Sequence, residues 1–166
     1  IGKLPSVDPE IYDVPKEVAE KLLPDYEKKR VAALKVSKWH YPPKHIYRQG
    51  VTMMHTPSGA SAFDNEDKYK PRKKDGTLVK GFKNTYKRQA WDQPGFTVTM
   101  YSREISSQNN VHPGRFIGTD EEGKNLYSDA RVMTIYELMI MSSLPKKWNI
   151  PDWASDHFIR CVIGEG

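Results

Sequence analysis

Apolar positions repeat with helical spacing in two stretches near the start of the chain. The pattern predicts a first helix that Asp13 caps, with Pro15 in its opening turn, and that ends at Pro24. It predicts a second helix that begins after Asp25 as its cap. The residues expected to face the core are Val18, Ala19, Leu22 and Leu23 in the first helix, and Tyr26, Val31 and Leu34 in the second.

Three later stretches predict strands. Residues 46–54 form the first, with Gly50 as a bulge, and residues 77–82 form the second, after a turn at 73–76. Residues 96–101 alternate, with Phe96, Val98 and Met100 on one side and Thr97, Thr99 and Tyr101 on the other. A polar loop follows this strand, and its hydrogen-bonding side chains are of the kind that contact phosphates and base edges.

The clearest helix start lies near the end of the chain. Thr134 and Glu137 have the spacing of a capping box, in which each side chain satisfies the other residue's backbone N–H. The helix expected over 135–142 is apolar nearly all round, which predicts burial, and Pro145 fixes its end. The pattern as a whole predicts an α+β fold: irregular β structure, short flanking helices and a buried C-terminal helix.

Composition narrows this picture. The chain has 166 residues, of which 37% are apolar and which include 12 prolines and 11 glycines, so we expect one loop-rich domain. No apolar run approaches the roughly 20 residues of a membrane span, and we expect no membrane partner. The single cysteine excludes an internal disulfide and fits a cytoplasmic location. The five histidines lack the spacing of a zinc site, so we expect no metal.

Charge is concentrated in one segment. The net charge of the whole chain is +5, yet residues 68–88 hold nine lysines or arginines against one aspartate and carry +8. Tyr69, Phe82 and Tyr86 are interleaved with these cations. Such a segment is typical of a surface that follows nucleic-acid phosphates, while a solvated basic loop is the alternative.

Several phrases of the sequence resemble one enzyme family. The phrases at 91–99, 111–115 and 128–137 are similar, in this order, to the C-terminal part of bacterial DNA (cytosine-5)-methyltransferases. The phrase His-Thr-Pro-Ser-Gly-Ala-Ser-Ala-Phe-Asp-Asn at 55–65 also resembles the family's recognition region, and 158–166 resembles its last motif. The resemblance is close from about Tyr86 onward and looser before it.

This resemblance implies an architecture and partners. It implies a target-recognition, DNA-binding region over 1–127 and a conserved block over 128–166 that joins it to an N-terminal catalytic domain. Because the chain begins at Ile1 and stops at Gly166 within the last motif, we expect it to be part of a longer protein. The implied partners are duplex DNA and that catalytic domain, the cofactor is S-adenosylmethionine, and the location is the nucleoid.

The resemblance also assigns site residues. It implies that Thr97 and Val98 lie near the target nucleotide, although Arg103 and Glu104 replace the customary Gly-Gly that follows. Gly164 and Glu165 would lie beside the cofactor, with Glu165 in place of the usual asparagine. The full set expected at DNA is Lys73, Lys74, Lys87, Arg88, Thr97, Val98, Thr99, Ser106, Ser107, Gln108, Asn109, Asn110 and Arg115.

No catalytic residue is expected in this chain. The family's reaction needs the thiolate of a Pro-Cys pair, and the sequence contains no such pair. Cys161 is the sole thiol, and we expect it to be a small buried hydrophobic residue. Two other hypotheses stay open: a non-catalytic nucleic-acid-binding module, and a purely structural or protein-interaction domain.

Overall fold

The computed structural model describes residues 1–14, 25–107 and 110–165, and its mixed helices and strands confirm the α+β class. The helix expected before Pro24 lies outside the described residues. None of the described helices is long and apolar enough to cross a bilayer.

The described elements follow one another in this order along the chain: β1 (Glu10–Tyr12), α2 (Tyr26–Val36), β2 (Lys44–Ile46), α3 (Tyr47–Met54), the 3₁₀ turns η1 (Ala62–Asp64) and η2 (Asp67–Tyr69), β3 (Phe116–Thr119), β4 (Asn125–Tyr127), α4 (Ile135–Met141) and α5 (Asp156–Glu165).

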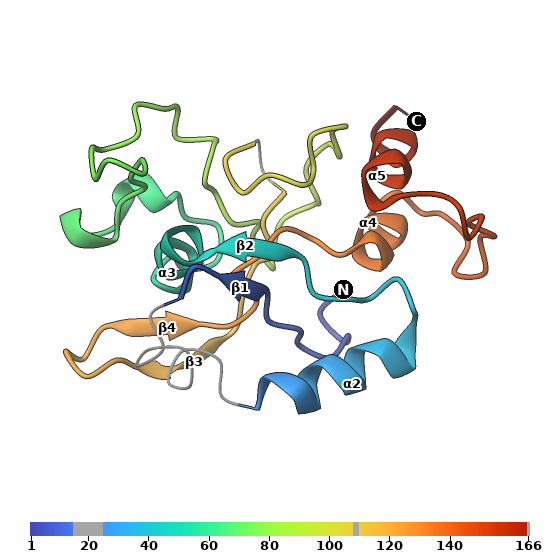
Figure 1. The fold of residues 1–166 in the computed structure, drawn as a ribbon, viewed down its shortest axis with the longest axis horizontal. Helices are drawn as coiled ribbons and strands as arrows, with labels where there is room; N and C mark the ends of the chain where they lie inside the picture. Colours follow the sequence, from blue (N-terminus) through green and yellow to red (C-terminus); the bar gives the residue numbers. More distant parts are fainter. Residues whose placement is uncertain (15–24, 108–109, 166) are drawn as a thin grey trace.

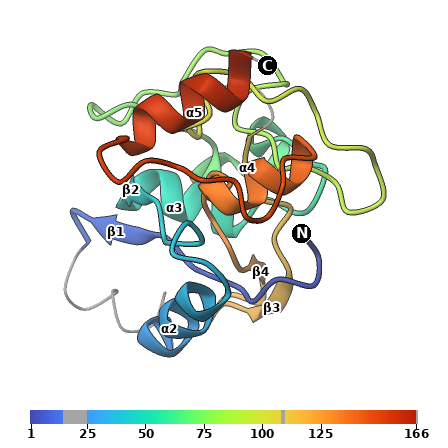
Figure 2. The ribbon, with the colours of Figure 1, turned by 90° about the vertical axis from the view of Figure 1, so that its right-hand side faces the viewer.

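Two small sheets and long loops surround a helical centre. β1 and β2 pair in parallel with Ile11 opposite His45, and β3 and β4 form an antiparallel hairpin. α4 and α5 pack together at one end of the molecule (Figure 1). The loops coloured green to yellow, residues 70–107, lie mostly on the side opposite α2 (Figures 1 and 2). This loop-rich side is the one that carries most of the basic segment. The segment just before these loops bonds the hairpin turn, because Tyr69 donates to Asp120 and Lys68 pairs with Glu122.

The apolar core has two parts. One part gathers residues from α3, the loops and the strand-like segment at 130–132, and the other joins α4 to α5. Their buried members are Met53, Met54, Ala62, Tyr86, Ile105, Val111, Ala130 and Val132 in the first, and Met133, Ile135, Leu138, Met139, Ile150, Ala154, Ile159 and Ile163 in the second.

The predicted capping box at the start of α4 is confirmed. The Thr134 hydroxyl accepts from the Glu137 backbone N–H at 3.2 Å, and the Glu137 carboxylate accepts from the Thr134 N–H at 2.8 Å. Ile135, Leu138 and Met139 are buried, as the all-apolar pattern predicted. Local spacing alone therefore located this helix and its environment correctly.

The strand predicted over 46–54 is wrong, because most of this stretch is helix α3. Gly50 is not a bulge: a Cβ there would lie 2.6 Å from Ile11 Cδ1, so glycine allows the helix to pack closely on β1. Apolar residues at Val51, Met53 and Met54 satisfy an alternating pattern and a helical one equally over so short a stretch. Tertiary packing against β1 decides for the helix.

The strands predicted over 77–82 and 96–101 are also wrong. The first contributes one isolated bridge, between Arg72 and Leu78, although the turn before it is present, with Gly76 at φ +83°. Residues 96–101 lie along α4 and α5 without a strand partner, and Val98 packs into the second core. Helices, rather than a neighbouring strand, cover this segment.

α2 begins at the expected residue and Asp25 is at its N-cap position, but the predicted side-chain cap is absent. Asp25 has a left-handed backbone and bonds Lys28 Nζ at 2.9 Å instead of capping the helix. Of the predicted core face, Tyr26 and Leu34 are half-buried. Ala33 is the buried residue of α2, whereas Val31 is exposed. A small side chain lets this weakly amphipathic helix approach the rest of the protein.

Candidate nucleic-acid interface

Lys73 and Lys74 stand on a well-defined turn. The Asp75 carboxylate accepts from both the backbone N–H and the hydroxyl of Thr77, at 2.9 and 2.7 Å, and Gly76 N–H donates to Lys73 O. Both lysines are exposed, and neither has an ion pair within the described part of the chain. The predicted turn therefore presents two exposed lysines that form no ion pair in the described residues.

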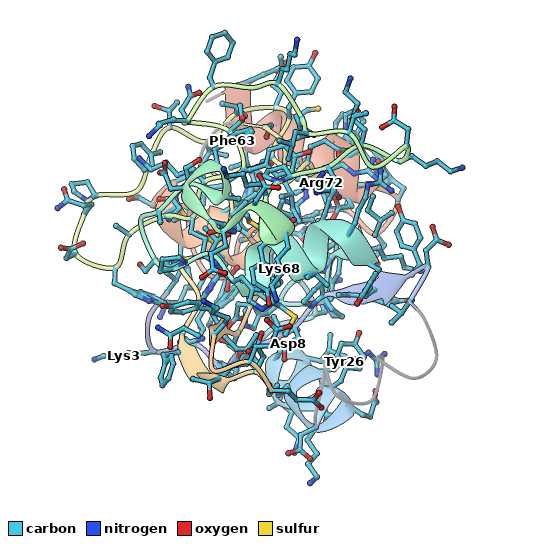
Figure 3. All side chains as sticks on the ribbon, turned by 90° about the vertical axis from the view of Figure 1, so that its left-hand side faces the viewer. Lys3, Asp8, Tyr26, Phe63, Lys68 and Arg72 are labelled. Atoms are coloured by element: carbon cyan, nitrogen blue, oxygen red, sulfur yellow. The ribbon has the colours of Figure 1, made fainter. Side chains whose placement is uncertain are left out.

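Other cations of the basic segment are partly neutralised. Lys83 pairs with Asp64 at 2.9 Å and Arg72 pairs with Asp67 at 3.0 Å, while Lys68 pairs with Glu122. Lys68 and Arg72 lie on the side of the molecule shown in Figure 3. In the described residues, the lysines of the segment left without an acidic partner are Lys73, Lys74, Lys80 and Lys87. The effective charge of this surface is thus smaller than the +8 of the segment.

Lys87 has an aromatic neighbour in place of an acidic one. Its Nζ lies 5.6 Å from the centre of the Phe96 ring, within the range of a cation–π contact. This contact joins the basic segment to residues 96–101. Lys87 and Thr97, which were both expected at DNA, consequently lie on neighbouring segments of the same loop-rich side.

Arg88 is not at the surface where it was expected. Its side chain is fully buried, and its guanidinium donates to the carbonyls of Met53, Ser128, His112 and Asp129 over 2.7–3.2 Å. Burial lowers the pKa of Arg88 to about 10, so it stays charged at neutral pH. Carbonyl oxygens of three segments satisfy this charge, and Arg88 therefore holds the loops together.

A buried charged network lies beside Arg88. Arg131 donates to both oxygens of Glu137 at 2.7 and 3.0 Å and to Asp129 Oδ1 at 2.8 Å. Burial by itself would raise the pKa of Glu137, but the Arg131 charge outweighs it and lowers that pKa to about 2. The same guanidinium, with His112, holds the pKa of Asp129 far below its usual range against the effect of burial. Both carboxylates are therefore ionised at neutral pH.

His112 is a neutral member of this network. Its Nδ1 accepts from Gly114 N–H at 3.0 Å, so the proton is on Nε2, which lies 3.6 Å from Glu137 Oε1. Burial lowers the pKa of His112 to about 4 in spite of the carboxylates nearby. Trp91 packs edge-on against the ring at 5.4 Å.

Arg115 anchors the start of the chain. Its Nη1 lies 3.1 Å from Asp129 Oδ2, and its Nη2 donates to Gly2 O and Leu4 O. Asp129 also accepts from the Ser6 hydroxyl and the Val7 N–H. The guanidinium that we expected at DNA is thus occupied, half-buried, with internal partners.

The polar loop is largely tied to itself. Asn110 is buried, and its Nδ2 donates to Tyr101 O, Glu104 O and Ser107 Oγ over 2.8–3.3 Å. The Ser107 hydroxyl in turn donates to Tyr101 O and Glu104 O. Ser106 is half-buried, whereas Gln108 and Asn109 lie outside the described residues. Asn110 and Ser107 shape this loop and leave few of their own groups for DNA.

Thr97 is exposed, and Thr99 contacts α5. A Cβ on Gly164 would lie 2.5 Å from the Thr99 carbonyl carbon and the Met100 nitrogen, so glycine is needed for this close packing. Glu165 is exposed at the end of the helix. The structure therefore brings the residues expected near the target nucleotide next to those expected near the cofactor. Cys161 is only partly buried, near His157, so full burial was wrong.

Arg160 is a positioning residue that the sequence patterns did not single out. It is buried on α5, where its Nε donates to Asp156 Oδ2 at 2.7 Å and its Nη1 donates to Ser102 O at 3.1 Å. This link fixes the 101–107 loop on α5. The i, i+4 spacing of Asp156 and Arg160 was the available signal, but such pairs are usually on the surface.

The chain was compared with protein families, curated proteins and solved structures. No family model matches the chain, and no solved structure matches it. It is 46% identical over 145 residues to the type II methyltransferase M1.HgaI of Avibacterium volantium. The match covers 86% of this chain and 38% of that protein, so the chain spans well under half the length of the curated relative. The chain is therefore similar to one part of a type II methyltransferase.

Proposed function

We propose that this chain is the target-recognition part of a type II DNA methyltransferase that methylates carbon 5 of cytosine in duplex DNA. The observation that carries the proposal is the 46% identity to a type II methyltransferase over 86% of the chain. The cytosine-5 assignment rests on the phrases at 91–99, 111–115 and 128–137. Because the sequence has no Pro-Cys pair, the nucleophile would come from another part of that enzyme.

The loop-rich side is the surface that we propose for DNA. Lys73, Lys74 and Lys80 offer charges without acidic partners in the described residues, and Lys87 and the Thr97 hydroxyl lie on adjoining segments. Lysine and threonine side chains of this kind bind phosphates and set the register of a protein on a duplex. Arg88, Arg115 and Asn110 support this surface from within.

S-adenosylmethionine is the methyl donor that we propose for the whole enzyme, and Gly164 and Glu165 are the residues of this chain that the resemblance assigns to it. Gly164 is in close contact with the backbone at Thr99, and Glu165 is exposed, so the two do not form a cradle. We therefore propose that other parts of the methyltransferase hold the cofactor. α5 would contribute through its packing against Thr99, which fixes the Thr97 segment.

Charge reversal at the turn provides the first test. Lys73→Glu with Lys74→Glu should weaken binding of mixed-sequence duplex DNA by about tenfold at moderate salt, and should reduce the slope of log K against log salt by about 2. The physical reason is the loss of two phosphate contacts and their released counterions. Fluorescence anisotropy at several salt concentrations measures both quantities.

The matched control is Lys146→Glu with Lys147→Glu. These lysines are also adjacent and exposed, but they follow α4 at the other end of the molecule (Figure 1). Their reversal should change affinity much less. If the two double variants lose DNA affinity equally, net charge alone explains the effect. If the unmodified chain does not bind DNA, the DNA-binding proposal is wrong.

The product of methylation provides a second test. Plasmid DNA from cells that express the full-length methyltransferase should contain 5-methyldeoxycytidine. Digestion to nucleosides followed by liquid chromatography and mass spectrometry identifies the product. Thr97→Val in the same enzyme should lower the yield more than it lowers DNA affinity, because a misplaced target base costs rate. N6-methyladenine or N4-methylcytosine as the product would contradict the cytosine-5 assignment.

A further inference from the structure

Phe82 is the most exposed large apolar side chain in the described part of the chain, at 80%. Burying such a side chain is favourable, so its exposure leaves a substantial apolar surface in water. It sits on the loop-rich side within the basic segment. An exposed aromatic ring among lysines is a feature of surfaces that contact the bases of nucleic acids.

The loop that carries Phe82 is braced from below. The Phe82 carbonyl accepts from both the backbone N–H and the hydroxyl of Thr85, at 2.9 and 2.8 Å. A Cβ on Gly81 would lie 2.9 Å from the Phe63 ring, so the backbone lies directly on that ring. Phe63 in turn packs edge-on against buried Tyr86 at 5.9 Å. A continuous set of contacts thus connects the core to the tip of the loop.

Positive charge lies close to this exposed ring along the chain. Lys80 and Lys83 flank Phe82 in the sequence, and Lys83 is held at 2.9 Å by Asp64 on η1. Lys80 has no acidic partner in the described residues and remains available. The ring itself offers no charge or hydrogen bond to a phosphate. A partner that binds both features therefore needs phosphates outside and flat apolar faces inside, which is the chemistry of a nucleic-acid duplex.

We propose that Phe82 inserts between adjacent base pairs of the bound duplex as an apolar wedge. This inference rests on the DNA-binding function proposed above. Lys80 brings a phosphate to the loop, and the braced backbone reduces the ordering cost of placing the ring in the groove. Wedges of this kind partly unstack one base step and bend the duplex by roughly 20–90°. The resulting loss of stacking would favour extrusion of a neighbouring nucleotide.

The test measures binding and bending together. A mixed-sequence duplex of about 30 base pairs, with a donor and an acceptor dye at its ends, reports bending by energy transfer and binding by anisotropy. The unmodified chain should bend it. Phe82→Ala should remove the change in energy transfer and weaken binding about tenfold, yet keep the salt slope because no phosphate contact is lost. Phe82→Leu, which keeps an apolar wedge, should retain most of the bend.

Phe116→Ala is the matched control, since Phe116 on β3 is also exposed, at 61%, and lies on the opposite side of the molecule (Figure 1). It should bind and bend DNA as the unmodified chain does. Salt-dependent binding by the unmodified chain with unchanged affinity and bending in Phe82→Ala would overturn the wedge alone. A reduced salt slope in that variant would also overturn it, since the ring would then act by arranging the lysines. Absence of DNA binding by the unmodified chain would overturn the proposed function itself.

Discussion

Arg131→Ala is expected to destabilise the protein by about 3–5 kcal/mol, a large share of the roughly 5–15 kcal/mol that folds a domain. The side chain is fully buried and makes two bonds to Glu137, one to Asp129, and others to the carbonyls of Val7 and Val132. Its removal leaves two ionised carboxylates in the core without their main cation. Breaking a buried pair in this way costs more than the pair itself contributes, because the remaining charge is not solvated.

Urea unfolding followed by tryptophan fluorescence measures this loss. The control is Arg30→Ala, because Arg30 pairs with Glu27 on the exposed surface of α2, where such pairs contribute less than about 1 kcal/mol. Arg131→Lys should lie between the two, since one ammonium cannot reproduce the two-pronged contact with Glu137. If Arg131→Ala lowers the free energy of unfolding by less than about 1 kcal/mol, Asp129 and Glu137 become protonated or hydrated in the variant.

Local signals in the sequence predicted the local parts of this structure. The capping box of Thr134 and Glu137 and the turn at Gly76 each depend on residues within four positions of one another, and both are present. The prediction for 46–54 was wrong because a stretch of this length fits both periodicities, and packing against Ile11 on β1 favours the helix. Such a contact between distant segments has no signature in the local pattern.

The candidate interface was predictable only in part, for the same reason. The turn that carries Lys73 and Lys74 is present and both side chains are exposed, because a polar turn exposes its side chains whatever lies beneath it. Arg88 was counted with them, yet carbonyls from residues 24 to 41 positions away hold it in the core. The sequence shows that a residue is charged, but its interaction partners are known only from the tertiary structure. Phe82 and Tyr86 were both counted with this basic surface, but Phe82 is exposed whereas Tyr86 is buried in the core.

Stability is expected to fall by about 4 kcal/mol between about pH 7 and pH 5, well above the range in which carboxylates titrate. Two buried histidines are the reason. Burial, together with the Arg131 charge, lowers the pKa of His45 to about 3, and burial lowers the pKa of His112 to about 4. His40, bonded to Thr134 Oγ1 and Pro5 O, has its pKa lowered in the same direction by burial.

The sign follows from which state binds protons. In the unfolded chain these histidines take up protons as the pH falls through their ordinary pKa of 6.5, while in the folded chain His112 and His45 stay neutral until about pH 4 and 3. The unfolded state therefore gains protons first, and each histidine removes about 1.4 kcal/mol of stability per pH unit within that window. Above about pH 6.5 the stability should be insensitive to these groups. Glu137, with its pKa lowered to about 2, adds a further loss only below its ordinary 4.5.

Urea midpoints at several pH values between about 7.5 and 5 measure this dependence, and one substitution isolates its source. His112→Asn keeps an acceptor for Gly114 N–H and removes the titrating ring, so its stability should fall by about half as much over the same interval. His157→Asn, at an exposed position of α5, should follow the unmodified protein. A stability that does not change down to about pH 5 would contradict the neutral, buried state of these histidines. If His112→Asn loses as much stability as the unmodified protein, the loss on acidification comes from His45 and His40 instead.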